Sequence, residues 1–371
     1  MTSLCPIGFE PSLNGAVSQR SPDGDPSLLC CVLPHIALSG AAMSRILIIL
    51  ALAMLLWPAP HPGKPAAVRA GTLLVSARAL PLDSTDPARR RIGTLTYLGG
   101  WELQSAHPGF GGISALLAAA PGEMLALSDS GILMGFHVGD GPHLRRPFIA
   151  PLPVRPRDRH RPWWAWDSES LTHDPATDRY WVGFELQQSI CRYGPGFARV
   201  EACRTWPQIA AWPKTGSIES LARLPDGRFI AIGEMGMTAE GRHEALLFPG
   251  DPADAATGNP VPLRYTPPRG YRPTDAVALD ARHLLVLHRR LTLQDLFTAT
   301  IAIVDLPPIL SPGTILKGRT LARLAPPLLA DNFEGMTVTR EGGRPVLWII
   351  SDDNHEFFQR TLLLKFALRM M

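Results

Sequence analysis

The sequence predicts an all-β fold built from repeated short strands, and three observations support this prediction. Glycine and proline together account for 70 of 371 residues, about 19%, against a usual share of about 12%, which indicates many turns. After residue 70 the apolar runs are short and bounded by turn residues, as at 229–232 and 284–287, without a long helical period. A strand–turn–strand pattern also occurs five times. With 46% hydrophobic residues, the chain is too apolar for disorder.

The five repeats share polar positions at regular spacing. The first strands carry these residues at intervals of 55, 50, 56 and 59: Ser114, Glu169, Glu219, Asp275 and Glu334. The second strands end 13 to 18 residues later, at Asp129, Glu185, Glu234, His288 and Asp352. A period of about 40–60 residues built from short strands is typical of a β-propeller, in which each repeat is one blade. We therefore predict a single propeller of five or six blades. The strands at 72–80 and 92–103 either complete the fifth blade or begin a sixth.

The first 70 residues are predicted to lie outside the propeller. Residues 46–57 form an apolar run that follows Arg45; a membrane-spanning helix needs about 20 such residues, whereas a signal peptide needs fewer. We expect a signal peptide at 43–70, with 1–42 a mis-assigned start or a disordered extension, and the propeller domain at 71–371. The alternative is an uncleaved N-terminal anchor. We accordingly expect a periplasmic or secreted bacterial protein with no stable membrane span after cleavage.

Two cysteines remain after the first 70 residues are excluded, and they flank a predicted turn that contains two glycines. Cys191 and Cys203 stand on either side of Gly194-Pro195-Gly196, a sequence that favours a turn between paired strands. In an exported chain, two cysteines placed in this way favour a disulfide across the hairpin. The alternative is two free thiols on separate strands.

The repeated acidic positions predict a metal site, because the inner strands of a propeller line a central channel. The carboxylates expected to converge there are Glu169, Glu185, Glu219, Glu234, Asp275, Glu334, Asp352 and Asp353. A divalent cation would relieve their repulsion, and oxygen ligands favour calcium or magnesium over zinc. We predict Ca²⁺, with all of these except Asp352 as candidate ligands. The alternative is that each carboxylate accepts backbone hydrogen bonds from the next blade.

Basic and aromatic residues near the acidic positions predict the remainder of a site. Arginine suits phosphate or carboxylate groups, and histidine can act as an acid or base. The predicted catalytic residues are Glu334, Asp352, His288 and Arg289, and the predicted substrate-binding residues are Arg272, Arg360 and Trp166. Together with Trp163 and Trp164, Trp166 either walls a pocket or packs between blades. The chain contains no GxSxG motif, which argues against a conventional serine esterase.

Several of these segments resemble the bacterial phytase-like family, which is also called the "esterase-like activity of phytase" family. The resemblance covers about 90–370 and rests on GGISAL, DSESL, SIESLARLPDGRFIAIGE, RPTDAVAL, DNFEGM and WIISDDN followed by QRTLLL. It implies export, a propeller fold related to calcium-dependent phytases, and a hydrolase. The matched site positions are Glu169, Glu219, Asp275, Glu334, Asp352, Asp353 and Asn354. Ser114 departs from the acidic pattern, so we do not expect a symmetric ring of ligands.

These observations predict a metal-dependent hydrolase that acts on a small phosphate ester or a related ester. Two alternatives stay open: a non-catalytic periplasmic propeller whose structural metal supports binding of a ligand or protein, and a lactonase-like hydrolase. A basic rim favours the phosphate ester. The net charge of +3 comes without a run of basic residues, so we expect no nucleic-acid partner. We also expect a monomer.

Overall fold

The structure is a computed structural model that describes residues 68–120, 122–138, 144–158, 160 and 166–368. The predicted extension at 1–42 lies outside these residues, as do Trp163, Trp164 and the predicted signal peptide apart from 68–70. No helix within the described ranges has the length and apolar character needed to cross a membrane.

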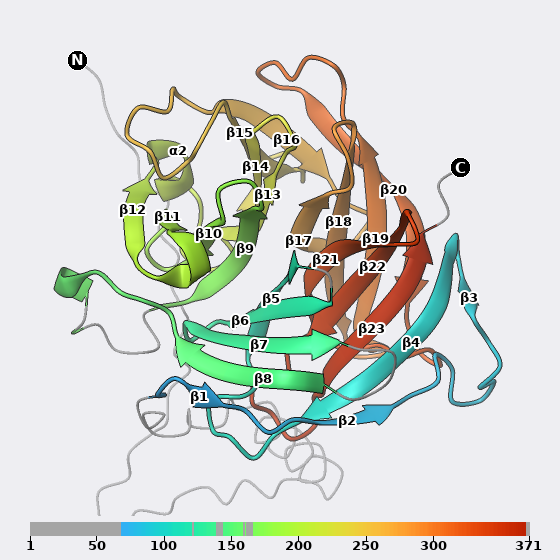
Figure 1. Ribbon diagram of the computed structural model, residues 1–371. Coiled ribbons are helices and arrows are strands. Elements are labelled where there is room, and N and C mark those ends of the chain that lie inside the picture. The colour runs from blue at the N-terminus through green and yellow to red at the C-terminus, as the bar shows by residue number, and fades with distance from the viewer. Residues whose placement is uncertain (1–67, 121, 139–143, 159, 161–165, 369–371) are drawn as a thin grey trace, which may run out of the picture. The chain divides into compact units, whose positions relative to one another are not determined.

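The described strands form five antiparallel blades arranged around a common centre (Figure 1). The first blade comprises β5 (Ile113–Ala120), β6 (Glu123–Ser128), β7 (Ile132–Val138) and β8 (Leu144–Pro151). The second comprises β9 (Ser168–Asp174), β10 (Arg179–Phe184), β11 (Ser189–Tyr193) and β12 (Val200–Thr205). The third comprises β13 (Ile218–Arg223), β14 (Phe229–Met237), β15 (His243–Phe248) and β16 (Val261–Thr266).

The fourth and fifth blades complete the ring. The fourth comprises β17 (Arg272–Ala278), β18 (His283–Thr292), β19 (Leu296–Asp305) and β20 (Ile315–Leu324). The fifth comprises β21 (Phe333–Glu341), β22 (Arg344–Ser351), β23 (Thr361–Leu368) and β4 (Leu95–Gln104). Each inner strand neighbours the inner strand of the next blade, and β21 neighbours β5. The prediction of an all-β propeller is therefore confirmed, with five blades in the described chain.

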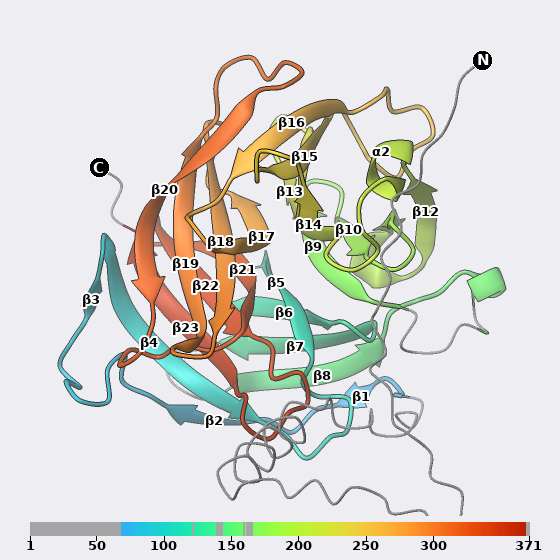
Figure 2. The ribbon, with the colours of Figure 1, turned by 180° about the vertical axis from the view of Figure 1, so that it is seen from behind.

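The N-terminal strand β4 closes the ring by pairing with the C-terminal strand β23, from Thr361 opposite Leu103 to Leu368 opposite Leu95. The short strands β2 (Ser76–Ala79) and β3 (Arg91–Ile92) pair with β4, and β1 (Gly71–Thr72) pairs with β8. Figure 2 shows β4 beside β23, and β16 beside β20, with which it pairs in parallel. The N-terminal strands thus complete the fifth blade, which was one of the two predicted arrangements.

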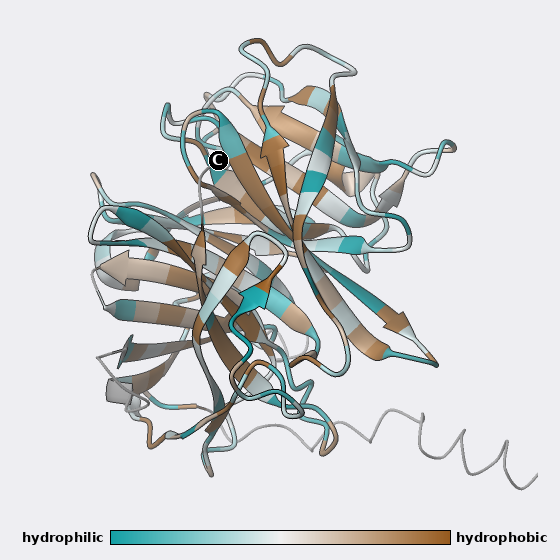
Figure 3. Cartoon of the chain, turned by 90° about the vertical axis from the view of Figure 1, so that its right-hand side faces the viewer, coloured by the Kyte–Doolittle hydropathy of each residue, from teal (hydrophilic) through white to brown (hydrophobic). Residues whose placement is uncertain are grey.

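The core consists of five apolar layers, one between each pair of neighbouring blades. For example, Leu285 and Leu287 of the fourth blade pack in one cluster with Met336 and Ile349 of the fifth. The other clusters fill the remaining four interfaces in the same way. Because neighbouring blades cover both faces of each blade, the inner strands are nearly continuously apolar. Figure 3 shows these apolar segments in brown along the strands, with hydrophilic residues mainly at loops and strand ends.

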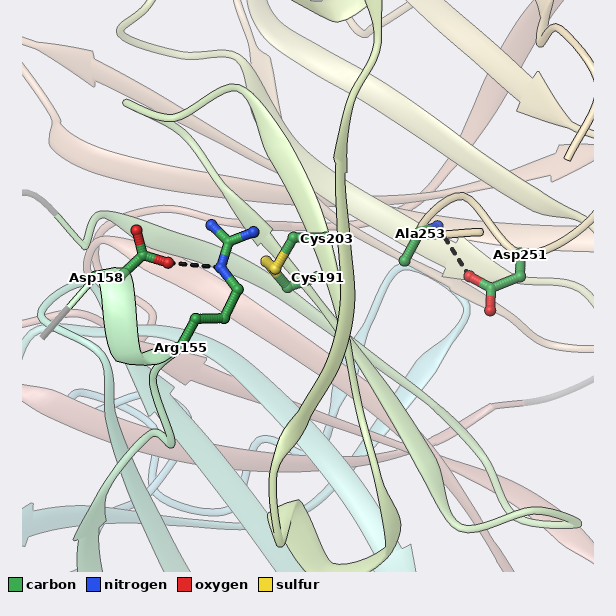
Figure 4. The surroundings of a disulfide bond; sticks show 6 residues. All are labelled: Arg155, Asp158, Cys191, Cys203, Asp251 and Ala253. Atoms are coloured by element: carbon green, nitrogen blue, oxygen red, sulfur yellow. Dashed lines mark hydrogen bonds and ion pairs between the residues drawn. A yellow bond between two sulfur atoms is a disulfide. The ribbon is translucent and has the colours of Figure 1, made fainter. Parts of the chain in front are cut away.

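A disulfide joins the outer two strands of the second blade, as predicted. Cys191 of β11 lies directly opposite Cys203 of β12, and the bond closes a hairpin with a sequence separation of 12 (Figure 4). The turn contains the 3-10 helix η3 (Pro195–Phe197), where Gly196 adopts φ +59°. The other short helices are η1 (Pro156–Asp158) and α2 (Pro207–Ala210). Glycine tolerates the left-handed backbone that this turn requires.

Candidate metal centre and active site

A β-bulge at the start of every inner strand positions the site. In each blade the register between the first and second strands shifts by one residue, which leaves one inner-strand residue outside the ladder. The bulged residues are Ser114, Glu169, Glu219, Thr274 and Glu334. A bulge redirects a side chain and often lies beside an active site. The three bulged glutamates all line the same central cavity.

The central cavity, of about 370 Å³, lies where the inner strands begin and the second strands end. Eight carboxylates line it: Asp129, Asp167, Glu169, Glu185, Glu219, Glu234, Glu334 and Asp352. Two arginines and an asparagine share the lining: Arg272, Arg289 and Asn354. The structure therefore brings together most of the carboxylates that the repeats predicted to converge.

Three of these carboxylates form a candidate metal site. One oxygen from each of Asp167, Glu169 and Glu185 lies within 4.8 Å of the others. Oxygens that bind one calcium ion at about 2.3–2.6 Å must lie within about 5 Å of each other, so this spacing fits a calcium ion. All three ligands are hard oxygen donors, which suit calcium or magnesium. This acidic triad could hold a metal.

Backbone donors orient the Glu185 side chain within the triad. Its Oε1 atom accepts hydrogen bonds from the backbone N–H groups of Gly216 and Ser217, the latter at 3.1 Å. Gly216 has φ +78°, and a Cβ there would lie 2.1 Å from the Met235 side chain, so this close approach requires glycine. Burial, together with a hydrogen bond to Asp167, raises the pKa of Glu185 to about 8. A bound cation would take the place of the proton that the raised pKa of Glu185 favours.

Burial and mutual repulsion dominate the electrostatics of the cavity. Burial raises the pKa of Glu169 well above its usual value, and the neighbouring Glu219 and Glu334 raise it further. The pKa of Asp352 is also raised, first by burial and then by Glu334. Without a cation, the cavity favours protonated carboxyl groups.

Arg289 is the counter-ion of Glu234 and Glu334, two cavity carboxylates outside the acidic triad. Its Nε atom donates to Glu234 at 3.0 Å, and one terminal nitrogen donates to Glu334 and to Asn332, the latter at 3.1 Å. Burial opposes the charged form, but Glu334, Glu234 and Glu219 raise the pKa of Arg289 overall. Most of its donors are therefore engaged by the protein, while the side chain lines the cavity, so the predicted catalytic role of Arg289 stays a prediction.

His288 lies outside the cavity, contrary to the predicted catalytic role. Its Nε2 atom is 2.6 Å from the Tyr265 hydroxyl, and its Nδ1 atom is 3.1 Å from the Thr300 carbonyl oxygen. The side chain is fully buried, and burial lowers its pKa to about 3. Successive strand residues face opposite sides, so only one of His288 and Arg289 can point into the cavity.

Asp275 serves the inter-blade role that the sequence left open as the alternative. In the fourth blade the bulge falls on Thr274, so Asp275 stays in the ladder opposite Leu287. Its carboxyl oxygens accept from the backbone N–H groups of Met336 and Ala276, each at 2.7 Å. Asp275 is buried and is absent from the cavity lining. The predicted metal-ligand role is corrected to a link between the fourth and fifth blades.

Replacing Asp275 with alanine should destabilise the ring without changing metal binding. The buried N–H group of Met336 would lose its acceptor, which costs about 1–3 kcal/mol of unfolding free energy. Urea unfolding of the variant and of Asp305→Ala, an exposed acid in the same blade, measures the difference. Loss of calcium binding with unchanged stability would contradict this assignment.

Two further predicted site residues are absent from the lining of the cavity. Asp353 accepts from the Gly112 N–H at 3.0 Å and from the Thr361 hydroxyl at 2.8 Å. Arg360 donates to Asp331 at 3.2 Å, and it lines a separate pocket with Asp353. These contacts do not support the predicted roles of Asp353 as a ligand and Arg360 as a substrate-binding group.

Trp166 packs against the apolar cluster between the first and second blades, which was the alternative to walling a pocket at the channel mouth. Its ring centroid lies 6.1 Å from that of Phe184, and both side chains border the Cys191–Cys203 disulfide. Figure 4 shows the disulfide with the Arg155–Asp158 ion pair nearby. Trp166 therefore lies outside the lining of the central cavity.

Sequence reasoning missed two cavity carboxylates. Asp129 follows the second strand of the first blade, in the position that Glu185 and Asp352 occupy in theirs, so the repeat alignment already contained its signal. Asp167 adopts φ +41°, and its carbonyl oxygen accepts from the Glu185 N–H at 2.8 Å. Nothing in its spacing distinguished Asp167 from an ordinary loop acid.

The fold and cavity together define a five-bladed propeller with an acidic central site. A family model described as "Phytase-like: Esterase-like activity of phytase" matches residues 108–355, about two thirds of the chain. The chain belongs to this phytase-like family, and the family description suggests an ester hydrolase. No curated protein matches the sequence significantly.

Solved structures show distant similarity to this chain. The luciferin-regenerating enzyme has a TM-score of 0.40 at 11% identity, covering 79% of this chain and 98% of its own. The WD40 propeller domain of Doa1 has a TM-score of 0.34 at 10% identity, covering 70% and 94%. Hydrazine synthase of Kuenenia stuttgartiensis has a TM-score of 0.36 at 11% identity, covering 80% and 81%.

Proposed function

We propose that this chain is an exported, calcium-dependent hydrolase of phosphate esters or related esters. The observation that carries the proposal is the acidic triad of Asp167, Glu169 and Glu185, which lines the same cavity as Arg272. A cation site beside a free guanidinium suits an anionic ester. Membership in the phytase-like family supports ester hydrolysis as the reaction class.

The metal fits the triad, because three oxygen donors meet there at a suitable spacing. Asp167, Glu169 and Glu185 would hold the ion. When bound, calcium would offset the carboxylate charge and polarise an ester oxygen. Arg289 keeps Glu234 and Glu334 in fixed positions through its hydrogen bonds.

Arg272 is the group best placed to bind an anionic substrate. It lines the cavity and is exposed, so its guanidinium can donate to phosphate or carboxylate oxygens. The other cavity arginine, Arg289, is already engaged by protein acceptors. We therefore assign substrate binding to Arg272.

Proton transfer falls to Asp352, with Glu334 beside it. Burial and the nearby Glu334 raise the pKa of Asp352, so its carboxyl group holds a proton under conditions where an ordinary aspartate is ionised. A carboxylic acid kept protonated in this way can donate a proton to the leaving alcohol. Glu334 accepts from Arg289 and from the Asn332 amide at 2.8 Å, which fixes its orientation toward the cavity.

Calcium titration and product assays on the full chain test the proposal. After chelator treatment, calorimetry measures calcium binding, and assays follow phytate, p-nitrophenyl phosphate, a carboxylic ester and a lactone. We expect calcium-dependent release of phosphate or alcohol that is lost in Glu185→Gln and retained in Glu240→Gln, an exposed control.

The other outcomes identify the alternatives. Calcium binding without turnover of any substrate would indicate a binding protein with a structural metal. Turnover of the lactone alone would indicate a lactonase-like enzyme. Absence of calcium binding would remove the metal from the proposal.

A further inference from the structure

Exposed apolar side chains lie on loops and strand ends at the end of the propeller where the central cavity opens. They belong to three consecutive blades, at the end where the second strands leave the cavity. We call this set the apolar rim: Met237, Leu291, Leu293, Leu296, Phe357 and Phe358. Leu293 is 96% exposed and Phe357 is 89% exposed, values that only projecting side chains reach. Large exposed apolar groups that gather in one place commonly mark an interaction surface.

The fourth blade places its rim residues on a regular hairpin directly beyond the cavity. Strand β18 pairs with β19 from Arg289 opposite Ala299 to Thr292 opposite Leu296 without a register shift. Alternate strand residues share a face, so Leu291 continues the face of Arg289, about 7 Å further along the strand. Arg289 lines the cavity, and the hairpin therefore carries Leu291 and Leu293 outward from its mouth.

Ion pairs and a ring contact brace this hairpin. Asp295, in the hairpin turn, pairs with Arg290 at 3.3 Å and with Arg323 at 3.5 Å. The Arg290 guanidinium lies over the ring of Tyr271, 4.9 Å from its centroid. The leucines are thus presented on a fixed support.

The neighbouring blades add to the rim in the same way. In the fifth blade, Asp352 and Asn354 line the cavity, and Phe357 and Phe358 follow in the same loop between β22 and β23. Their rings meet edge to face, with centroids 5.3 Å apart. In the third blade, Met237 is two residues beyond Met235, which also lines the cavity. The rim therefore borders the cavity on three blades.

The form of the rim fits a lipid surface better than a single ligand. The rim residues are projecting side chains with large exposed fractions, and none of them is in the lining of the central cavity. Side chains of this kind can enter the apolar boundary of a bilayer. Exposed cations stand at the same end, at Lys214, Arg269 and Arg272, together with the exposed acid Glu240 and the half-buried acid Glu356. Such cations favour anionic headgroups.

We propose that the apolar rim docks the propeller on the surface of an anionic lipid bilayer, with the mouth of the acidic cavity toward the lipid. Docking of this kind does not require hydrolysis. If the proposed function also holds, the hydrolysed ester is one presented among lipid headgroups, and this second part rests on that function.

Vesicle sedimentation tests the docking separately from catalysis. The full chain is mixed with phosphatidylcholine vesicles, with and without phosphatidylglycerol, and the bound fraction is measured. The rim variant Leu293→Asp/Phe357→Asp is compared with Ile309→Asp, which places the same charge on a 79% exposed side chain in the β19–β20 connection at the opposite end. Both variants keep the N-terminal apolar run, and thermal unfolding checks their folding.

We expect wild type and Ile309→Asp to bind equally, more strongly with phosphatidylglycerol, and the rim variant to bind at least about 10-fold more weakly. Equal binding by all three chains would overturn the proposal, because the contact would then lie elsewhere. Absence of wild-type binding would also overturn it. A dimer that the rim variant converts to a monomer, without vesicle binding, would assign the rim to a second copy of the chain. Each result is obtained whether or not the chain hydrolyses an ester.

Discussion

Replacing Glu169 with glutamine should stabilise the metal-free protein and abolish its stabilisation by calcium. Burial raises the pKa of Glu169, and neighbouring carboxylates, first Glu219 and Glu334, raise it further. A carboxyl group whose pKa is higher in the folded than in the unfolded state opposes folding once the pH exceeds the unfolded value, about 4.3. Glutamine has nearly the same shape and no charge. The variant's increase in unfolding free energy should therefore be present at neutral pH and absent below about pH 4.

Thermal unfolding in chelator and in calcium, at about pH 4 and about pH 8, checks this prediction. In chelator at about pH 8 the variant should unfold at a higher temperature than wild type. In calcium, wild type should unfold at the higher temperature. Loss of one ligand should weaken calcium binding by about 100-fold or more, since second-shell changes alone cost 10- to 100-fold. Glu240→Gln provides an exposed control. A variant that melts below wild type in chelator, yet responds normally to calcium, would identify Glu169 as a purely structural acceptor.

Replacing Arg289 with alanine should cost about 3–5 kcal/mol of unfolding free energy, because it leaves buried carboxylates without their counter-ion. Glu234 and Glu334 are only 5% and 8% exposed in their side chains, and both contact Arg289. Lysine at this position should restore only part of the loss, since an ammonium group cannot reproduce the planar fork of donors.

Urea unfolding of the metal-free chain measures this effect, with Arg272→Ala as the matched control from the same cavity. Arg272 is exposed, and we expect a change within about 0.5 kcal/mol. A loss below about 1 kcal/mol for Arg289→Ala would show that solvent already neutralises Glu234 and Glu334. In that case Arg289 would be available to bind the substrate.

The sequence was informative where the chemistry repeats. Apolar strands recur at a similar spacing because every blade buries the same layers, so the propeller could be predicted from the repeats. Glu169, Glu219 and Glu334 could be placed in one site for the same reason, since each occupies the bulge of its own blade.

The remaining site residues depend on geometry that repeat spacing does not encode. The bulge of the fourth blade lies at Thr274, one residue before the aligned Asp275, so Asp275 falls outside the cavity, and the alternation of β18 separates His288 from Arg289. Both effects arise from local register, which the identity of the residues does not reveal. Asp167 reaches the cavity through a left-handed backbone at a loop, which no apolar pattern predicts.

The pairing of β4 with β23 has a consequence for how the chain is made. Thr96 lies opposite Ala367, so a strand synthesised early stays without its partner until the last strand has left the ribosome. Contacts this distant in sequence form slowly, because a large loop must close before they stabilise the fold. Any chain that terminates before Thr361 would leave β4 and β22 with open edges, which invite pairing with other chains. Completion of translation is thus the step that separates an aggregation-prone open sheet from a closed ring.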